Sequence, residues 1–89
     1  MSAPHDSFLT FEYDDRSRAR LVERSIRPEI GEIDDERSWT VLSREGETLS
    51  VHIEAEDLVA LRAAMNTWLT LVDVAETVGR TRTGSRPAE

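Results

Sequence analysis

The sequence predicts a single α+β domain whose elements follow the order strand–helix–strand–strand–helix. Three observations support this prediction. Apolar and polar residues alternate with period two in 7–13 and 48–55, which is typical of strands with one buried face. Apolar residues recur with helical spacing in 16–26 and 58–78. A short loop at 44–47 separates two of the strands and indicates a hairpin.

The first strand is expected at 7–13, after a loose N-terminus at 1–6. Because side chains alternate along a strand, every second residue falls on the same face. One face carries Leu9, Phe11 and Tyr13, and the other carries Phe8, Thr10 and Glu12.

A helix is expected to follow, beginning at an N-cap formed by Asp14 or Asp15. Ala19, Val22 and other apolar residues are spaced helically up to about Ile26. The proline at position 28 is expected to end this helix, because proline disfavours the helical conformation in the residue before it.

An acidic connector is expected at 28–37, in which Ile30 and Ile33 attach the loop to the core. A second strand is expected at 39–43 and a third at 48–55. The loop between these strands contains a glycine, which can take the positive φ that a tight hairpin requires.

The topology follows from the element order. A right-handed crossover from the first strand to the second leaves room for the third strand between them, antiparallel to both. The prediction is a three-stranded antiparallel sheet in the order 1-3-2, with two helices on one face. The outer edge of the first strand stays unpaired, and an unpaired edge rich in aromatic residues invites a second chain.

The long helix is expected at 58–78, with Gly79 as its C-terminal breaker and a disordered tail at 80–89, so that the domain spans 7–79. A helix on one small sheet needs an apolar arc of about 100°, and this helix offers nearly twice that. We expect a second surface to cover the surplus, unless the first helix and the connector do so. The residues expected to cover the sheet are Leu61, Met65, Trp68, Leu69 and Val72.

The charge is acidic overall, with 18 acids against 11 bases and a net charge of −7, and every base is arginine. An acidic surface without lysine is typical of proteins from salt-loving microbes. The exception to this acidic character is a basic region on the helix at 16–26 and the residue after it. Its arginines project within an arc of about 80°. They either bind phosphate groups or pair with neighbouring acids. These candidate RNA contacts are Arg16, Arg20, Arg24 and Arg27.

Residues that support catalysis are scarce. The chain has no cysteine, and neither its histidines, His5 and His52, nor the acidic run 34–36 has the spacing of a metal site. His52 and Glu54 lie on the same face of one strand, but two residues do not make a metal site. We expect no catalytic, cofactor or metal site, and a soluble cytoplasmic protein without a membrane span.

One stretch resembles a known family. In the small Pcc-type subunit of the KEOPS complex, a strand runs through a short acidic step into a helix that bears Leu-Arg-Ala, then Asn, a small polar residue and an apolar pair. This sequence has that order within 49–72, as Leu61-Arg62-Ala63 followed by Asn66-Thr67-Trp68-Leu69. The opening 8–13 and the arginine-bearing helix after it also resemble the family, so that the resemblance spans 8–78.

The resemblance implies a non-catalytic scaffold, and the acidic, lysine-free composition favours a salt-adapted archaeon as its source. Members of this family are homodimers that bind the large catalytic subunit of KEOPS. The assembly makes N6-threonylcarbamoyladenosine at position 37 of tRNA, with the ATP and metal chemistry in the partners.

We expect the over-apolar helix to bind the catalytic subunit and the first strand, or the polar face of the sheet, to bind the second copy. The expected partner interface is Leu58, Ala60, Arg62, Ala64, Asn66, Trp68, Leu71 and Ala75, and the expected dimer edge is Phe8, Thr10, Phe11 and Tyr13. The alternative hypothesis is a small homodimeric RNA-binding module that uses the arginines of the first helix.

Overall fold

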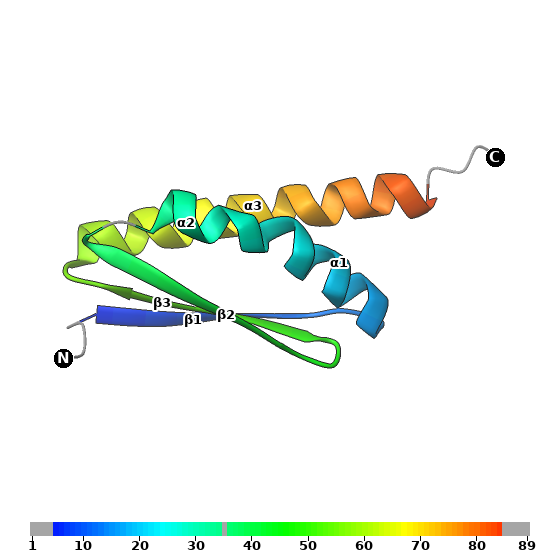
Figure 1. Cartoon of the computed structure of the whole chain (residues 1–89), viewed down its shortest axis with the longest axis horizontal. Helices are drawn as coiled ribbons and strands as arrows, with labels where there is room; N and C mark the ends of the chain where they lie inside the picture. The colour runs from blue at the N-terminus through cyan, green and yellow to red at the C-terminus, as the bar shows by residue number, and fades with distance from the viewer. Residues whose placement is uncertain (1–4, 35, 85–89) are drawn as a thin grey trace.

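The computed structural model describes residues 5–34 and 36–84 as a sheet with helices on one side (Figure 1). Its architecture is α+β, as predicted. The elements in chain order are β1 (His5–Glu12), α1 (Arg16–Ile26), the 3-10 turn η1 (Arg27–Glu29), α2 (Ile30–Ile33), β2 (Ser38–Glu45), β3 (Thr48–Ala55) and α3 (Leu58–Gly84).

The sheet has the predicted order β1-β3-β2, and both pairings are antiparallel. The β2–β3 hairpin turns at Gly46, whose φ of 62° lies in the left-handed region that glycine adopts without strain. Helices α1 and α3 both lie on one side of the sheet, and the other side carries no element of the described chain (Figure 1). The predicted strand order and antiparallel pairing are therefore confirmed, as is the placement of both helices on one face.

Helix α1 begins where the sequence predicts. The Asp15 carboxylate accepts a hydrogen bond from the backbone N–H of Arg18 at 2.8 Å, which caps the first turn. Ala19, Val22 and Ile26 are buried, so the helical spacing of these residues correctly identified the face that packs on the core.

The segment after α1 differs from the expected loop. Arg27 adopts helical backbone angles despite the proline that follows it, and the chain continues through η1 and α2 instead of leaving the helical region. Proline is well tolerated in a first turn because its missing N–H has no partner there. Ile30 and Ile33 pack against the core, as predicted.

Trp68 lies at the centre of the core. Its side chain is fully buried, and its indole N–H donates a hydrogen bond to the Thr40 hydroxyl at 3.0 Å. The β3 side chains that face it are also fully buried. The core cluster contains Val22, Ile26, Leu42, Leu49, Val51, Ile53, Ala55, Leu61, Ala64, Trp68, Val72 and Ala75.

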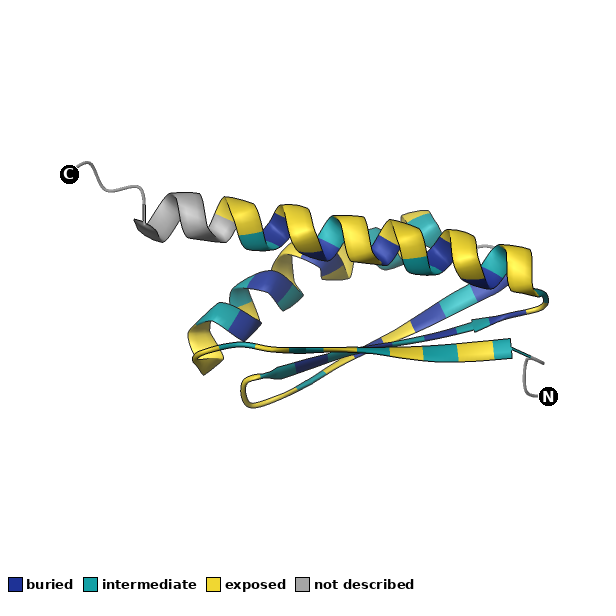
Figure 2. Cartoon of the chain, turned by 180° about the vertical axis from the view of Figure 1, so that it is seen from behind, coloured by how far each residue is buried: buried dark blue, intermediate teal, exposed yellow. Residues whose placement is uncertain are grey.

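Helix α3 is rotated relative to the prediction. Leu69, expected on the sheet, is 44% exposed, whereas Ala64 and Ala75 are buried. Small side chains let a helix approach its neighbours closely, whereas leucine buries a larger apolar area. The sequence pattern alone does not show which of these two effects decides the orientation of the helix. The buried stripe thus contains alanines beside Trp68. Figure 2 shows buried positions along the side of α3 that faces the sheet.

Helix α3 also runs to Gly84, six residues beyond its predicted end at residue 78. Glycine within a helix costs about 1 kcal/mol relative to alanine, which disfavours the helix without forbidding it. Of the predicted disordered tail, 80–84 are helical, and 85–89 lie outside the described residues. At the other terminus, β1 includes His5 and Asp6 from the segment expected to be loose.

Trp68→Ala is expected to lower the free energy of unfolding by about 3–5 kcal/mol, because it removes the largest fully buried side chain and opens a cavity. Urea denaturation at fixed protein concentration measures this change. The control Val59→Ala, at a side chain that is 72% exposed, is expected to cost less than about 1 kcal/mol. Equal losses in the two variants would contradict the assignment of the core.

Candidate functional site

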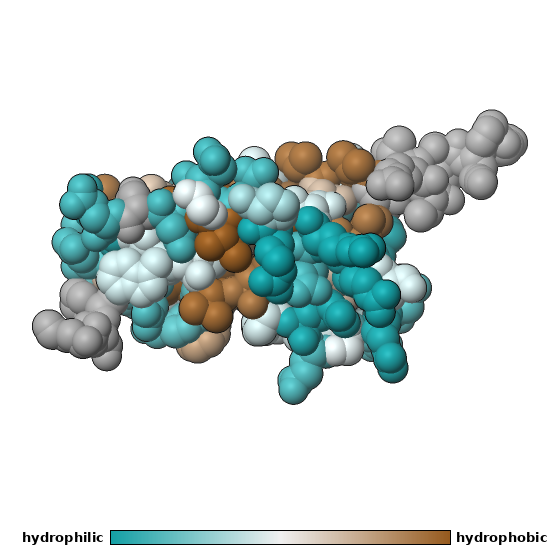
Figure 3. All heavy atoms as spheres, viewed as in Figure 1, coloured by the Kyte–Doolittle hydropathy of each residue, from teal (hydrophilic) through white to brown (hydrophobic). Residues whose placement is uncertain are grey.

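The outward face of α3 is an exposed surface that carries apolar side chains beside a polar stripe. We define it by the residues on the side opposite Trp68: Val59, Arg62, Ala63, Asn66, Thr70, Asp73, Val74 and Thr77. Val59 is 72% exposed and Val74 51% exposed. Figure 2 shows this exposed band along the side of α3 away from the sheet, and Figure 3 shows apolar side chains at the upper edge of the molecule.

The segment Leu58–Val78 has a mean hydropathy of 1.3 and is long and apolar enough to cross a membrane. In this fold it is the helix that covers the sheet, through the buried Leu61, Trp68 and Val72. Its removal from the sheet would expose the whole core. The same segment also leaves Leu58, Val59, Leu69, Val74 and Val78 exposed, and exposed apolar side chains on one helix favour a partner.

The structure corrects part of the expected partner interface. Trp68 is fully buried, and Ala64 and Ala75 are buried in the core, so these three side chains present no surface to a partner. Ala60 and Leu71 are half-buried against the core. The expected interface residues that remain exposed are Leu58, Arg62 and Asn66.

Val59, Ala63 and Val74 were missing from the expected interface, although the structure exposes all three. The sequence did contain a signal for them, because they lie beyond the main apolar stripe on a helical projection. The expected set instead took residues next to that stripe, because Leu69 was expected to cover the sheet.

A shallow groove of about 180 Å³ runs beside the outward face, where α3 passes α2 and the start of β2. Alanine side chains contribute much of its lining, so a bulky apolar side chain of a partner helix would find room there. The lining residues are Ile33, Arg37, Ser38, Val59, Ala60, Ala63, Ala64 and Thr67.

Polar contacts hold α3 near both ends. The Asp57 carboxylate accepts a hydrogen bond from the Ala60 N–H at 2.8 Å and also binds Arg37, and these contacts hold the pKa of Asp57 below its usual value. The Tyr13 hydroxyl donates to Glu76 at 2.7 Å. Burial, followed by this bond to a carboxylate, raises the pKa of Tyr13. The outward face is therefore presented on a fixed helix.

The outer face of the sheet is a second exposed surface. The strand register places Phe8, His52 and Val41 in one row across the three strands. Phe8 is 65% and Val41 57% exposed, and the Phe8 and His52 rings stack with centroids 4.0 Å apart. This aromatic and apolar row sits on a sheet face that the described chain leaves uncovered (Figure 1).

The expected dimer edge is divided between the two faces of β1. Phe8 and Thr10 lie on the exposed outer face, whereas Phe11 and Tyr13 are half-buried and pack against the core. The sequence predicted that these side chains alternate between the two faces of the strand. Placing all four in one interface conflicted with that alternation. Within the described residues β1 pairs only with β3, so its other backbone edge is open.

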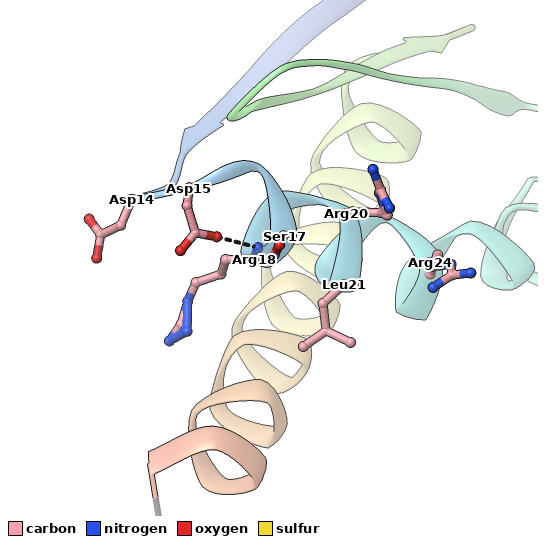
Figure 4. Close-up of a pocket in the computed structure, with 7 residues that line it drawn as sticks. All are labelled: Asp14, Asp15, Ser17, Arg18, Arg20, Leu21 and Arg24. Atoms are coloured by element: carbon pink, nitrogen blue, oxygen red, sulfur yellow. Dashed lines mark hydrogen bonds between the residues drawn. The ribbon is translucent and has the colours of Figure 1, made fainter.

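The arginines of α1 do not form one converging site. A hollow of about 540 Å³ lies along α1, and Figure 4 shows the Arg18, Arg20 and Arg24 side chains pointing in different directions around it. Acids contribute to the same lining, which weakens any attraction for an anion. The full lining is Asp14, Asp15, Ser17, Arg18, Arg20, Leu21 and Arg24.

Arg27 belongs to a structural ion-pair network. It pairs with Glu23, whose carboxylate also accepts a hydrogen bond from Arg44 Nε at 2.7 Å and so links α1 to β2. The bonds from Arg44 and Arg27 lower the pKa of Glu23. In the described part of the chain, Arg16, Arg20 and Arg24 are exposed and their side chains make no ion pair.

The acidic run is not assembled into a site among the residues described. Asp34 accepts a hydrogen bond from the Thr40 N–H at 3.0 Å and so ties α2 to β2. Asp35 lies outside the described residues. His5 is half-buried on β1, and His52 Nε2 lies 2.9 Å from an Asp6 carboxylate oxygen.

The sequence matches the family model described as transcription factor Pcc1 over residues 8–79. The chain belongs to the Pcc1 family. None of the curated proteins compared with it is a significant match. The Pcc1 family is associated with the KEOPS complex as a non-catalytic factor subunit. The matched range includes β1, the α1–α2 segment, the hairpin and α3 up to residue 79, so both exposed surfaces lie within it.

Glu23→Gln is expected to reduce the free energy of unfolding at pH 7 by about 1 kcal/mol, because it removes the charged acceptor of two arginines. Because the folded state lowers the pKa of Glu23, this contribution is present above the carboxyl's usual pKa of 4.5 and disappears as the pH falls through the lowered value. Urea denaturation between pH 7 and pH 3 measures the difference between variant and wild type.

The exposed Glu12→Gln on β1 is the control, since its side chain makes no ion pair in the described residues. A Glu23→Gln difference that stays constant down to pH 3 would show that the network contributes no charge-dependent stability.

Proposed function

We propose that this chain is a non-catalytic scaffold and dimerisation subunit of the KEOPS complex, which binds the catalytic subunit that makes N6-threonylcarbamoyladenosine at position 37 of tRNA. The outward face of α3 is the observation that supports this function most strongly. Exposed apolar side chains spaced along a fixed helix are suited to pack against helices of a larger protein.

The outward face has the composition of such an interface. Val59, Ala63 and Val74 are exposed apolar or small side chains on this face, and its charge is confined to Arg62 and Asp73. Arg62 and Asn66 stand one helical turn apart and offer polar contacts that fix the register of a partner helix. The alanine-lined groove beside them receives a side chain from that helix.

The second copy of the chain is assigned to the sheet. The open edge of β1 offers backbone hydrogen bonds, and the row Phe8–His52–Val41 offers apolar area on the adjoining face. Because α3 and the outer face of the sheet lie on opposite sides of the molecule, one chain has room for both partners at once (Figure 1). The complex works in the cytoplasm, and the catalytic chemistry belongs to the partner.

A small homodimeric RNA-binding module is the second candidate. It rests on Arg16, Arg20 and Arg24, which are exposed and free of ion pairs within the described part of the chain. Guanidinium groups in this state are suited to phosphate. The divergence of the side chains in Figure 4 and the net charge of −7 favour the scaffold.

Val74→Asp is expected to weaken binding to the catalytic KEOPS subunit of the same genome by at least about 100-fold, because it buries a carboxylate in an apolar interface. Isothermal titration in high salt measures the affinity. The side chain is 51% exposed in the free chain, so circular dichroism and the mass of the chain alone are expected to stay unchanged.

The matched control is Val41→Asp, which puts the same charge on the outer face of the sheet at a side chain 57% exposed. It is expected to abolish the dimer and to leave binding of the catalytic subunit within about threefold of wild type. The reverse pattern, with Val74→Asp breaking the dimer and Val41→Asp breaking the complex, would exchange the two surfaces and overturn this assignment.

The double reversal Arg20→Glu/Arg24→Glu tests the second candidate. If α1 contacts tRNA, this variant binds tRNA with lower affinity. The slope of log K against log salt concentration also falls by about 2, one unit for each phosphate contact that is lost. Filter binding across a salt series measures both quantities. The charge-matched Arg80→Glu/Arg82→Glu is the control, and equal effects of the two variants would exclude a specific contact at α1.

A further inference from the structure

Three potential metal ligands converge on the outer face of the sheet. Donor atoms of Asp6, His52 and Glu54 all lie within 4.8 Å of one another. We propose that these three residues bind a divalent transition-metal ion. Neither the family match nor the proposed scaffold function assigns this site. From the sequence, only His52 and Glu54 were expected on this face, because Asp6 was expected in a loose N-terminus.

The sheet register creates this cluster. Asp6 on β1 is directly opposite Glu54 on β3, and His52 is two residues from Glu54 on the same face. Two of the three ligands thus share a strand, and the third comes from the neighbouring strand at hydrogen-bonding distance. Strands hold their side chains more firmly than loops do, which favours a preformed site.

The His52–Asp6 spacing suits one ion, and the Glu54 oxygen, which lies within 4.8 Å of the other donors, joins them by a side-chain movement. His52 Nε2 and Asp6 Oδ2 are 2.9 Å apart. Two ligands about 2.1 Å from an ion and in adjacent coordination positions lie about 3.0 to 3.4 Å apart, so both fit after movements of a few tenths of an ångström. In the metal-free chain the same two atoms form a hydrogen bond, which holds them near this spacing.

Neighbouring side chains orient two of the ligands. The Trp39 indole N–H donates to Glu54 Oε1 at 2.6 Å and leaves Oε2 for the ion. The Phe8 ring stacks on the imidazole of His52 with an interplanar angle of 6° and so fixes the plane of that ring. Ligands whose orientation is set by such partners bind metal more tightly, typically by 10–100-fold.

The donor set indicates the class of ion. One imidazole and two carboxylates suit zinc or a similar first-row ion, because nitrogen donors are poor ligands for calcium and magnesium. The Asp6 side chain is 53% exposed in the single chain, which leaves room for water in the coordination. The net charge of the three side chains, with neutral histidine, is −2 and balances a divalent cation.

Zinc titration of the untagged full chain at pH 7.5 tests the site, with calorimetry for affinity and proton NMR of the imidazoles for location. We expect one zinc per chain and a shift of the His52 resonances. The chain has only two histidines, so His5 is an internal control on the same protein. His52→Gln and Asp6→Asn are each expected to reduce affinity at least tenfold.

Two further variants distinguish zinc binding at this site from nonspecific binding to an acidic surface. Glu12→Gln removes one carboxylate from the far end of the same face and is expected to leave zinc affinity unchanged. Trp39→Phe keeps all three ligands but removes the donor to Glu54, and is expected to weaken zinc about tenfold with circular dichroism unchanged.

The absence of saturable binding below roughly 1 mM zinc would overturn the proposal. A Kd of that size corresponds to a binding free energy of about 4 kcal/mol. Unchanged affinity in His52→Gln, or one zinc per two chains, would also overturn it. The titration uses the chain alone, so its failure leaves the scaffold function standing, and loss of partner binding leaves the metal site standing.

Discussion

The packing of α3 on the sheet, centred on the fully buried Trp68, is the interaction on which the rest of the structure depends. The described sheet has three strands and one of its faces is covered by helices. It can therefore hide only one side of a helix that is apolar on most sides. Trp68 fixes which side this is, through its burial and its hydrogen bond to Thr40. The orientation of α3 then determines which side chains this helix presents to a partner.

Two surfaces follow from this geometry, and they face opposite ways. The outward face of α3 carries Val59 and Val74, and the outer face of the sheet carries the Phe8–His52–Val41 row. An isolated domain of this size is marginally stable because it buries only about 60% of its unfolded surface, so covering either surface adds stability. The Pcc1 family membership and the two surfaces together support a subunit that connects other proteins.

The sequence was sufficient to predict the fold because its strand and helix patterns are distinct. The alternation in β1 and β3, the cap at Asp15 and the hairpin at Gly46 each have a local cause that a sequence reveals. The rotation of α3 was not predictable in the same way, since nearly every side of the helix is apolar. The Asp6–His52–Glu54 cluster escaped prediction because it depends on register between strands far apart in sequence.

The mass of the chain in high salt, measured by light scattering on a sizing column with and without the catalytic KEOPS subunit of the same genome, tests the central claim most directly. The scaffold function predicts about twice 10.1 kDa alone and a stable larger complex when the catalytic subunit is added. A dimer that ignores the catalytic subunit would contradict the scaffold function, and a stable monomer would contradict the dimer as well.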